Sequence, residues 1–253
     1  MPWAARRRLF ILTIVGAVFL AFAAIVYIAF FYQVPSCTDG VQNQDEEGVD
    51  CGGSCPYLCV AQEDAPTVLY SKALLNGPGR TDVIALVENK NADAMAKDVP
   101  YTLTVFGADQ TLIQQVTGTL DLPPGASVPV FVPGINSGSQ TSATAFLSID
   151  PSSVAWVKGS DTRTLPRVSG TELTGSATAP RVTATLSNSS VNPLADVPVV
   201  VIVHAADGNV IGASRTVIPI IDGQGSATAT FTWNSAFPEP PTSIEVIPVI
   251  PLP

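Results

Sequence analysis

Four cysteines lie together in the N-terminal quarter of the chain, in a segment rich in acidic residues. They are Cys37, Cys51, Cys55 and Cys59. An even number of cysteines in a segment too short to bury an apolar core predicts a disulfide framework, and four cysteines allow three pairings. A zinc site with four thiolate ligands is the weaker interpretation, because an oxidising compartment favours disulfides.

The acidic residues of this segment could bind a hard cation. The candidate ligands carry carboxylate or amide oxygens among turn-forming glycines, and they are Asp39, Asn43, Asp45, Glu46, Glu47 and Asp50. Oxygen ligands of this kind suit Ca²⁺, and crowded carboxylates repel one another unless a cation or covalent closure offsets the repulsion. The alternative is a solvated acidic loop held by disulfides. Calcium is the one cofactor that the chain suggests.

The spacing from Cys37 to Cys59 is C-x-D-G-x-x-N-x-x-E-x-G-x-D-C-G-G-x-C-x-x-x-C. It resembles a small cysteine-rich module that recurs beside membrane anchors and between domains in bacterial and archaeal surface proteins. The resemblance implies a surface protein and no particular activity.

An unbroken apolar run from Leu9 to Tyr32 precedes this module, directly after three arginines at 6–8. At about 1.5 Å per residue, a helix of this length crosses a hydrocarbon core of roughly 30 Å. The run is too long for the core of a cleavable signal peptide and ends in aromatic residues, which favours an uncleaved anchor. The alternative is a lipoprotein, because Val34–Cys37 loosely resembles a lipobox, and a lipoprotein is also tethered to the membrane. The positive-inside rule puts residues 1–8 in the cytoplasm and the rest of the chain outside the membrane.

After the anchor, the apolar residues come in short runs of Val, Ile, Leu and Thr, broken by Pro, Gly, Asn and Asp. The 22 prolines disfavour helices and are tolerated at strand starts, edges and turns. This pattern indicates an all-β fold. The roughly 220 residues after the anchor correspond to two modest domains.

A weak internal repeat, with a spacing of about 100 residues, supports two domains. An Asn at a strand end, an Asp-Val-Pro entry into a long apolar strand, and a Gly before a strand ending in Phe recur in the same order. The matched residues are Asn89 and Asn188, Asp98–Pro100 and Asp196–Pro198, Gly125 and Gly225, and Phe131 and Phe231. Each copy has about seven β-prone runs, which predicts two tandem Ig-like or fibronectin-like β-sandwiches.

Both copies resemble Ig-like β-sandwiches of the FxLYD and late-embryogenesis-abundant type, which in bacteria often occur on membrane-anchored proteins. The resemblance is carried by Asn89 and Asn188, the long apolar strand and the turn at Asp207–Ile211. Where that family prefers Tyr-Asp before the turn, this chain has Phe106-Gly107 and His204-Ala205. The family implies no catalytic residues.

The expected organisation is a cytoplasmic N-terminus, a transmembrane helix, a juxtamembrane cysteine module and two sandwiches. These parts correspond to residues 1–8, 9–32, 33–62, 63–165 and 172–253. The segment Gly159–Pro180, rich in Ser, Thr and Gly, is expected to hold the boundary. We also expect each sandwich to have its own core, with few contacts between the two.

Composition and motifs narrow the function. The net charge of -9 argues against a nucleic-acid partner. His204 is the only histidine, and its place in an apolar strand indicates packing; no common catalytic motif is present. We therefore expect a non-catalytic surface stalk or protein-binding module with a protein partner at the cell surface. The alternative is a subunit of an envelope assembly of the secretion or pilus type, and an enzyme is the third class.

Overall fold

The computed structural model describes residues 3–31, 36–43, 45–77, 79–137, 142–176 and 178–253. The described residues form one N-terminal helix, one short 3₁₀ helix and thirteen strands, so the expected all-β fold is confirmed. The chain divides into two compact units, Met1–Cys55 and Pro56–Pro253.

The first unit begins with helix α1 (Trp3–Phe31). Its segment Arg6–Ala29 is 24 residues long, contains a stretch with a mean hydropathy of 2.9, and has none of that stretch buried. The Thr13 hydroxyl donates within the helix to the carbonyls of Leu9 and Phe10, so it needs no outside partner. The helix is long and apolar enough to cross a membrane. Tyr32, the last residue of the predicted span, and the segment 33–35 lie outside the described residues.

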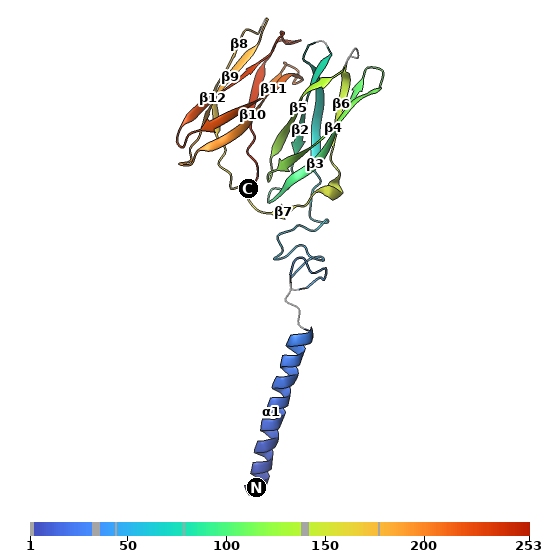
Figure 1. Ribbon diagram of the computed structural model, residues 1–253, viewed down its shortest axis with the longest axis vertical. Coiled ribbons are helices and arrows are strands. Elements are labelled where there is room, and N and C mark those ends of the chain that lie inside the picture. The colour runs from blue at the N-terminus through green and yellow to red at the C-terminus, as the bar shows by residue number, and fades with distance from the viewer. Residues whose placement is uncertain (1–2, 32–35, 44, 78, 138–141, 177) are drawn as a thin grey trace. The chain divides into compact units, whose positions relative to one another are not determined.

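The second unit begins with a pair of antiparallel sheets, the first sandwich (Figure 1). One sheet has the order β1-β2-β5, with β1 at Thr67–Leu75, β2 at Arg80–Glu88 and β5 at Ser127–Asn136. The other has the order β4-β3-β6, with β3 at Ala94–Gly107, β4 at Leu112–Leu122 and β6 at Ser142–Ser148. A 3₁₀ turn, η1 (Pro151–Ser153), leads to the short strand β7 (Val157–Lys158), which pairs with the start of β3.

The second sandwich repeats this topology. One sheet has the order β12-β9-β8, with β8 at Arg167–Thr174, β9 at Arg181–Ser187 and β12 at Ser226–Thr232. The other has the order β11-β10-β13, with β10 at Leu194–His204, β11 at Val210–Ile221 and β13 at Ser243–Pro248. Strands β8 to β13 therefore correspond in order to β1 to β6, and the weak sequence repeat coincides with a repeat of strand order.

Two details of the strand assignment differ from the sequence expectation. The sequence predicts two separate β-prone runs at Val210–Ala213 and Thr216–Ile221. They form one strand, because Ser214 and Arg215 continue the ladder with β10. The segment Gly159–Pro180, expected to hold the boundary, also contains β8, whose polar residues belong to a mostly exposed edge strand. The sequence also predicts that alternate residues of Ser226–Trp233 share one face, and Ala227, Ala229, Phe231 and Trp233 all contribute to one core.

A buried asparagine joins the two sheets of the first sandwich. The Asn89 side chain, which is 1% exposed, lies just after β2. Its amide donates to the carbonyls of Ala94 (2.9 Å), at the start of β3, and Pro123 (2.7 Å), just after β4. Its Oδ1 accepts from the Asn91 backbone N–H, and its own N–H donates to Ala126, next to β5. One residue thus connects the ends of four strands from both sheets.

Asn188 makes the same contacts in the second sandwich. Its amide donates to Asn192 (2.8 Å), Ile221 (3.3 Å) and Asp222 (3.2 Å), and its Oδ1 accepts from the Ser190 N–H. Its backbone N–H donates to the Gly225 carbonyl, as that of Asn89 donates to the Ala126 carbonyl. The predicted matches of Gly125 with Gly225 and of Phe131 with Phe231 are therefore each displaced by one residue. The predicted match of Asn89 with Asn188 therefore reflects a shared hydrogen-bonding role.

The strands that face the other sandwich are buried on both sides. In β10, Val199, Val201 and Val203 point into their own core, as the strand period of two requires. The intervening Val200 and Ile202 pack against Ile84 of β2, in a third apolar cluster between the sandwiches. Burying each such side chain contributes about 1.5–3 kcal/mol.

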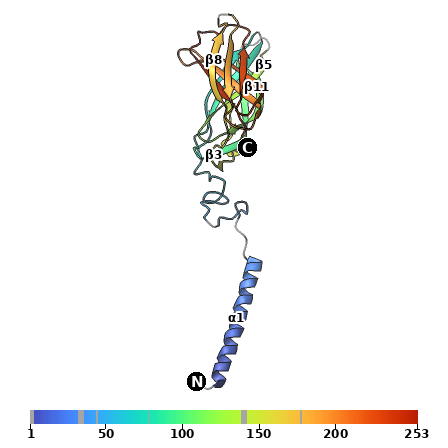
Figure 2. The same ribbon diagram turned by 90° about the vertical axis from the view of Figure 1, so that its left-hand side faces the viewer.

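Each sandwich has the core of its own that the sequence predicts, and this smaller third cluster is the apolar contact between them. Figure 1 shows β10 and β11 beside β2 and β5, and Figure 2 looks onto the outer β12-β9-β8 sheet with the other layers behind it. Within the second unit, the sheets thus form four successive layers. Tyr70 of β1 packs against this cluster, and burial together with the charge of Glu245 raises its pKa to about 12, so the phenol stays neutral.

We predict that Asn89→Ala lowers the free energy of unfolding by about 3 kcal/mol, because two buried carbonyls lose their donor. Asn89→Asp is expected to be worse, since a carboxylate would face those carbonyls. Denaturant unfolding of the full chain, followed by circular dichroism, measures both. Asn209→Ala, in an exposed turn, is the matched control and should change stability by less than about 0.5 kcal/mol. Equal losses in Asn89→Ala and the control would contradict the role given to Asn89.

Candidate functional site

The cysteine module is the first candidate site. Cys37 and Cys55 form a disulfide, one of the pairs allowed by the pairings left open above. Cys51 and Cys59 are also disulfide-bonded, and no cysteine among the described residues is free. The predicted disulfide framework is therefore present, and none of the four sulfurs is a thiolate that could bind zinc.

The Asp39 and Asp50 carboxylates are bound by N–H groups of their own loop. Asp39 accepts from the Val41 N–H and the Asn43 side-chain amide, both at 2.9 Å. The Asn43 bond, followed by the Val41 bond, lowers the pKa of Asp39, so it stays ionised. Asp50 accepts from the backbone N–H groups of Asp39 (3.0 Å) and Gly40 (2.9 Å).

Glu46 is the buried carboxylate of the module, only 8% exposed. Its Oε2 accepts from the backbone N–H groups of Asn43 (3.1 Å) and Asp50 (3.3 Å). Its Oε1 lies 3.1 Å from the Cys55 Sγ, a packing contact because a disulfide sulfur carries no proton to donate. Glu46 therefore closes the loop from inside.

Asp45 and Glu47 lie on the exposed side of the loop. Asp45 accepts from the Ser54 hydroxyl at 2.8 Å. The backbone at Gly53 has φ +50°, and a Cβ there would lie 1.9 Å from the Asp45 carbonyl oxygen. Gly52 has φ +76°, and a Cβ there would lie 2.6 Å from the Glu47 Cβ. Only glycine fits at these two positions.

These hydrogen bonds weaken the case for a bound cation. The carboxylates of Asp39, Glu46 and Asp50 gather in one loop, and backbone N–H groups compensate their charge. Among the described residues, the one group of three potential metal ligands is Cys37, Glu46 and Cys55, of which both sulfurs are in the disulfide. The Asn43 Oδ1 is buried without a hydrogen-bond partner, which leaves an oxygen available. Calcium binding stays a prediction.

His204 lies at the end of β10. Its Nδ1 is 3.2 Å from the Gly208 carbonyl oxygen, and its Nε2 is 4.0 Å from a Glu245 carboxylate oxygen. The Ala205 N–H donates to the Asn209 carbonyl across the same turn, so the chain turns tightly at Asp207-Gly208. The ring contacts support this turn and the neighbouring β13.

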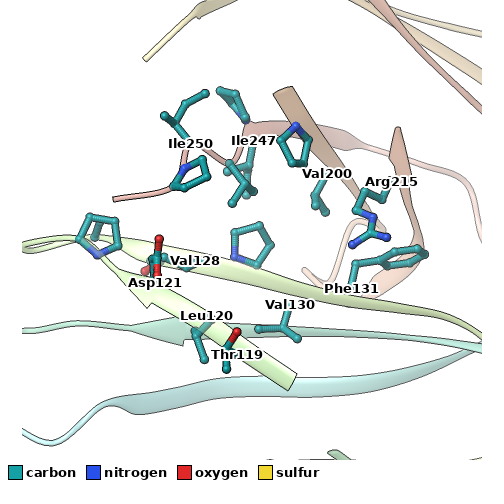
Figure 3. Close-up of a pocket in the computed structure, with 18 of the residues that line it drawn as sticks. Thr119, Leu120, Asp121, Val128, Val130, Phe131, Val200, Arg215, Ile247 and Ile250 are labelled. Carbon is teal, nitrogen blue, oxygen red and sulfur yellow. The ribbon is translucent and has the colours of Figure 1, made fainter. Parts of the chain in front are cut away.

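A groove between the sandwiches, with a volume of about 440 Å³, is the second candidate site (Figure 3). The first sandwich contributes Leu120, Val130 and Phe131, and the second contributes Val200 and Ile247. Sequence analysis did not find it, because its walls come from segments far apart in the chain. The available signal was the run of consecutive apolar residues at 199–203, which breaks the alternation of a strand with one exposed face.

Two charged groups at the groove are engaged within the protein. The Asp121 carboxylate accepts from the N–H groups of Asp98 (2.9 Å) and Leu252 (2.7 Å). The Arg163 guanidinium forms a bidentate ion pair with the Asp161 carboxylate, in which Nη2 lies 2.7 Å from Oδ2. It also donates a hydrogen bond to the Ile250 carbonyl. The Arg163 guanidinium lowers the pKa of Asp161. These bonds fasten the C-terminal tail at the rim.

Tyr101 and Arg215 also line the groove, from opposite sandwiches. Burial raises the pKa of the Tyr101 phenol, and the positive charge of Arg215 acts against that shift. Among the described residues, neither the phenol nor the Arg215 guanidinium forms a hydrogen bond or an ion pair. Both groups are therefore open to a ligand.

No protein-family model and no curated protein matches the chain. Among solved structures, the chain is similar to a transglutaminase from red sea bream, with 11% sequence identity and a TM-score of 0.24. The alignment covers 74% of this chain and 29% of the transglutaminase, so the chain spans less than a third of that protein's length. A likeness at this level carries no information about activity.

We predict that calcium at 10 mM raises the melting temperature of the full chain by a few degrees relative to EDTA. Extracellular modules bind with Kd of about 10⁻⁴ to 10⁻³ M, which at this concentration stabilises by about 1.4 kcal/mol or more. Asn43→Ala should remove the increment, because it deletes the open oxygen. Differential scanning calorimetry in matched buffers measures both. If calcium does not change the melting temperature of the unaltered chain, the calcium prediction is wrong and the module is a solvated acidic loop held by disulfides.

Proposed function

We propose that this protein is a non-catalytic, single-pass membrane protein whose two β-sandwiches lie outside the cytoplasm and act as a stalk or protein-binding module. One observation carries the proposal: an apolar helix of membrane-spanning length, with none of its most apolar stretch buried, precedes a disulfide-bonded, β-rich region in the same chain. An exposed helix of this length is stable in a bilayer and would aggregate in water.

Two independent features support the orientation. Arg6, Arg7 and Arg8 flank the N-terminal end of the apolar segment, and the positive-inside rule keeps such residues in the cytoplasm. The disulfides lie on the other side of the segment, and disulfides persist in oxidising compartments. Both features favour export of the residues after the helix.

The identity of the modules is part of the proposal. The cysteine spacing supports a surface-protein module, and the equal strand order of the two sandwiches supports Ig-like domains of the FxLYD type. The shared contacts of Asn89 and Asn188 support a common origin of the two domains. The absence of catalysis is inferred from the sequence, and the packing role of His204 is consistent with it.

An exposed aromatic patch on the first sandwich supports protein binding. Phe106 and Phe146 make an edge-to-face contact with ring centroids 6.0 Å apart on the outer side of the β4-β3-β6 sheet. Phe146 is 59% exposed, and Leu112, paired with Phe106, is 58% exposed. Phe106 is half-buried beneath them, and exposed apolar side chains gathered on a sheet surface are typical of protein contact surfaces.

Topology is tested with a specific protease site inserted after Val60, which is 83% exposed. Protease added to intact spheroplasts should cut the chain and release the β-rich fragment. A cytosolic protein carrying the same site is the control and should be cut only after lysis. Cutting of the membrane protein only after lysis would overturn the orientation, and a mature N-terminus at Cys37 would favour the lipoprotein alternative.

Partner binding is tested by crosslinking on intact cells, followed by purification of the tagged chain. We expect Phe146→Ser to lower the yield of crosslinked partner at least fivefold, because it removes the exposed ring of the patch. Leu75→Ser is the matched control, since Leu75 is 67% exposed on β1 of the other sheet. Equal yields of crosslinked partner from Phe146→Ser and Leu75→Ser would show that the aromatic patch is not the partner-binding surface.

The alternative is a subunit of an envelope assembly. Gly16, Ala17, Ala21 and Ala24 provide small residues along α1, where another helix could approach closely. The same crosslinking experiment separates the two functions, because a fixed set of membrane partners in equal amounts would favour the assembly.

A further inference from the structure

We propose that the groove between the sandwiches binds a small amphiphilic anion, a molecule with an apolar body and a single carboxylate or sulfonate group. The groove volume of about 440 Å³ lies within the range of about 300–1,000 Å³ that small-molecule sites occupy. Such sites occur preferentially where two domains meet.

The strand register places apolar and cationic groups in one row. Across the β13-β10-β11 sheet, Ile247 lies opposite Val200, and Val200 lies opposite Arg215. Directly paired residues of neighbouring strands point to the same face, so two apolar side chains and a guanidinium line one wall together. Figure 3 shows this wall facing Phe131 of β5, while the neighbouring Val130 points into the core of the first sandwich. The row matches a ligand with an apolar end and an anionic end.

Charge decides the sign of the ligand. Asp121 and Arg163 are engaged in bonds within the protein, and Arg215 is the cation at the groove without such a partner among the described residues. The Tyr101 phenol, whose pKa is raised by burial, is neutral and supplies a hydrogen-bond donor at the groove. Asp98 also lines the groove, and its negative charge disfavours a ligand with a second anionic group.

The lining also favours a small molecule over an added peptide strand. Strand addition needs backbone N–H groups along an open edge, and proline has none. Five prolines line the groove: Pro123, Pro129, Pro198, Pro248 and Pro251. Recognition therefore depends on side chains, which suits a compact ligand.

The test is isothermal titration calorimetry of 4-phenylbutyrate into the full chain in lipid nanodiscs, with empty nanodiscs as the blank. We expect one site per chain, with weaker binding of the neutral analogue 4-phenylbutan-1-ol. Arg215→Gln should weaken phenylbutyrate binding at least about tenfold, because it removes a charge-assisted hydrogen bond. Arg167→Gln, an exposed arginine on β8, is the matched control and should bind like the unaltered chain.

A second variant tests the location independently of charge. Thr119 lines the groove from an exposed position on the edge strand β4, so Thr119→Trp should fill the groove without disturbing the core. It should abolish phenylbutyrate binding while the melting temperature stays within about two degrees. Absence of binding to the unaltered chain at millimolar phenylbutyrate would overturn the proposal. Equal affinity for the alcohol, or equal losses in Arg215→Gln and Arg167→Gln, would also overturn it.

Discussion

The buried asparagine at the end of β2, and its counterpart after β9, is the interaction on which each sandwich depends. Two sheets that pack only through apolar side chains can slide, because such contacts have little directionality. Asn89 ties β2 and β5 of one sheet to β3 and β4 of the other, through hydrogen bonds that permit one geometry. A buried carbonyl without its donor costs about 1–3 kcal/mol, so alternative alignments of the sheets are penalised.

The relation between the sandwiches follows from strands that are buried on both faces. Val199, Val201 and Val203 complete the core of the second sandwich, and Val200 and Ile202 face the first. This arrangement makes the second unit a stack of four sheets joined by apolar contacts. It also creates the groove, because the twisted faces of two sheets separate towards their edges. The tail bonds of Asp121 and Arg163 border that opening.

In the cysteine module, the repulsion between carboxylates is offset by backbone N–H groups, which the amino-acid composition does not reveal. Carboxylates in a short loop were expected to need a cation or covalent closure. The disulfide supplies closure, and the backbone supplies N–H groups to Asp39, Glu46 and Asp50. Gly52 and Gly53, with positive φ, let the chain turn closely enough past Asp45 and Glu47 to complete the loop. The carboxylates of the loop are thus hydrogen-bonded within it, and the buried Asn43 Oδ1 has no hydrogen-bond partner.

The sequence by itself determined the features that depend on local composition and spacing. The length of the apolar run predicted α1, and the prolines and short β-branched runs predicted an all-β fold. The repeat of Asn89 in Asn188 predicted two copies with one strand order. These features depend on the chain's own residues, so they can be recognised without knowing what packs against them.

Only the tertiary structure decided what lies between the elements. The second burial face of β10 and the position of β8 depend on which sheets meet, and Arg215 acquires its setting from Val200 and Phe131, which are remote in the chain. The hydrogen-bond partners of the module carboxylates depend on backbone directions set by the loop. Contacts of this kind arise from packing and geometry between distant segments, and neither composition nor periodicity encodes them.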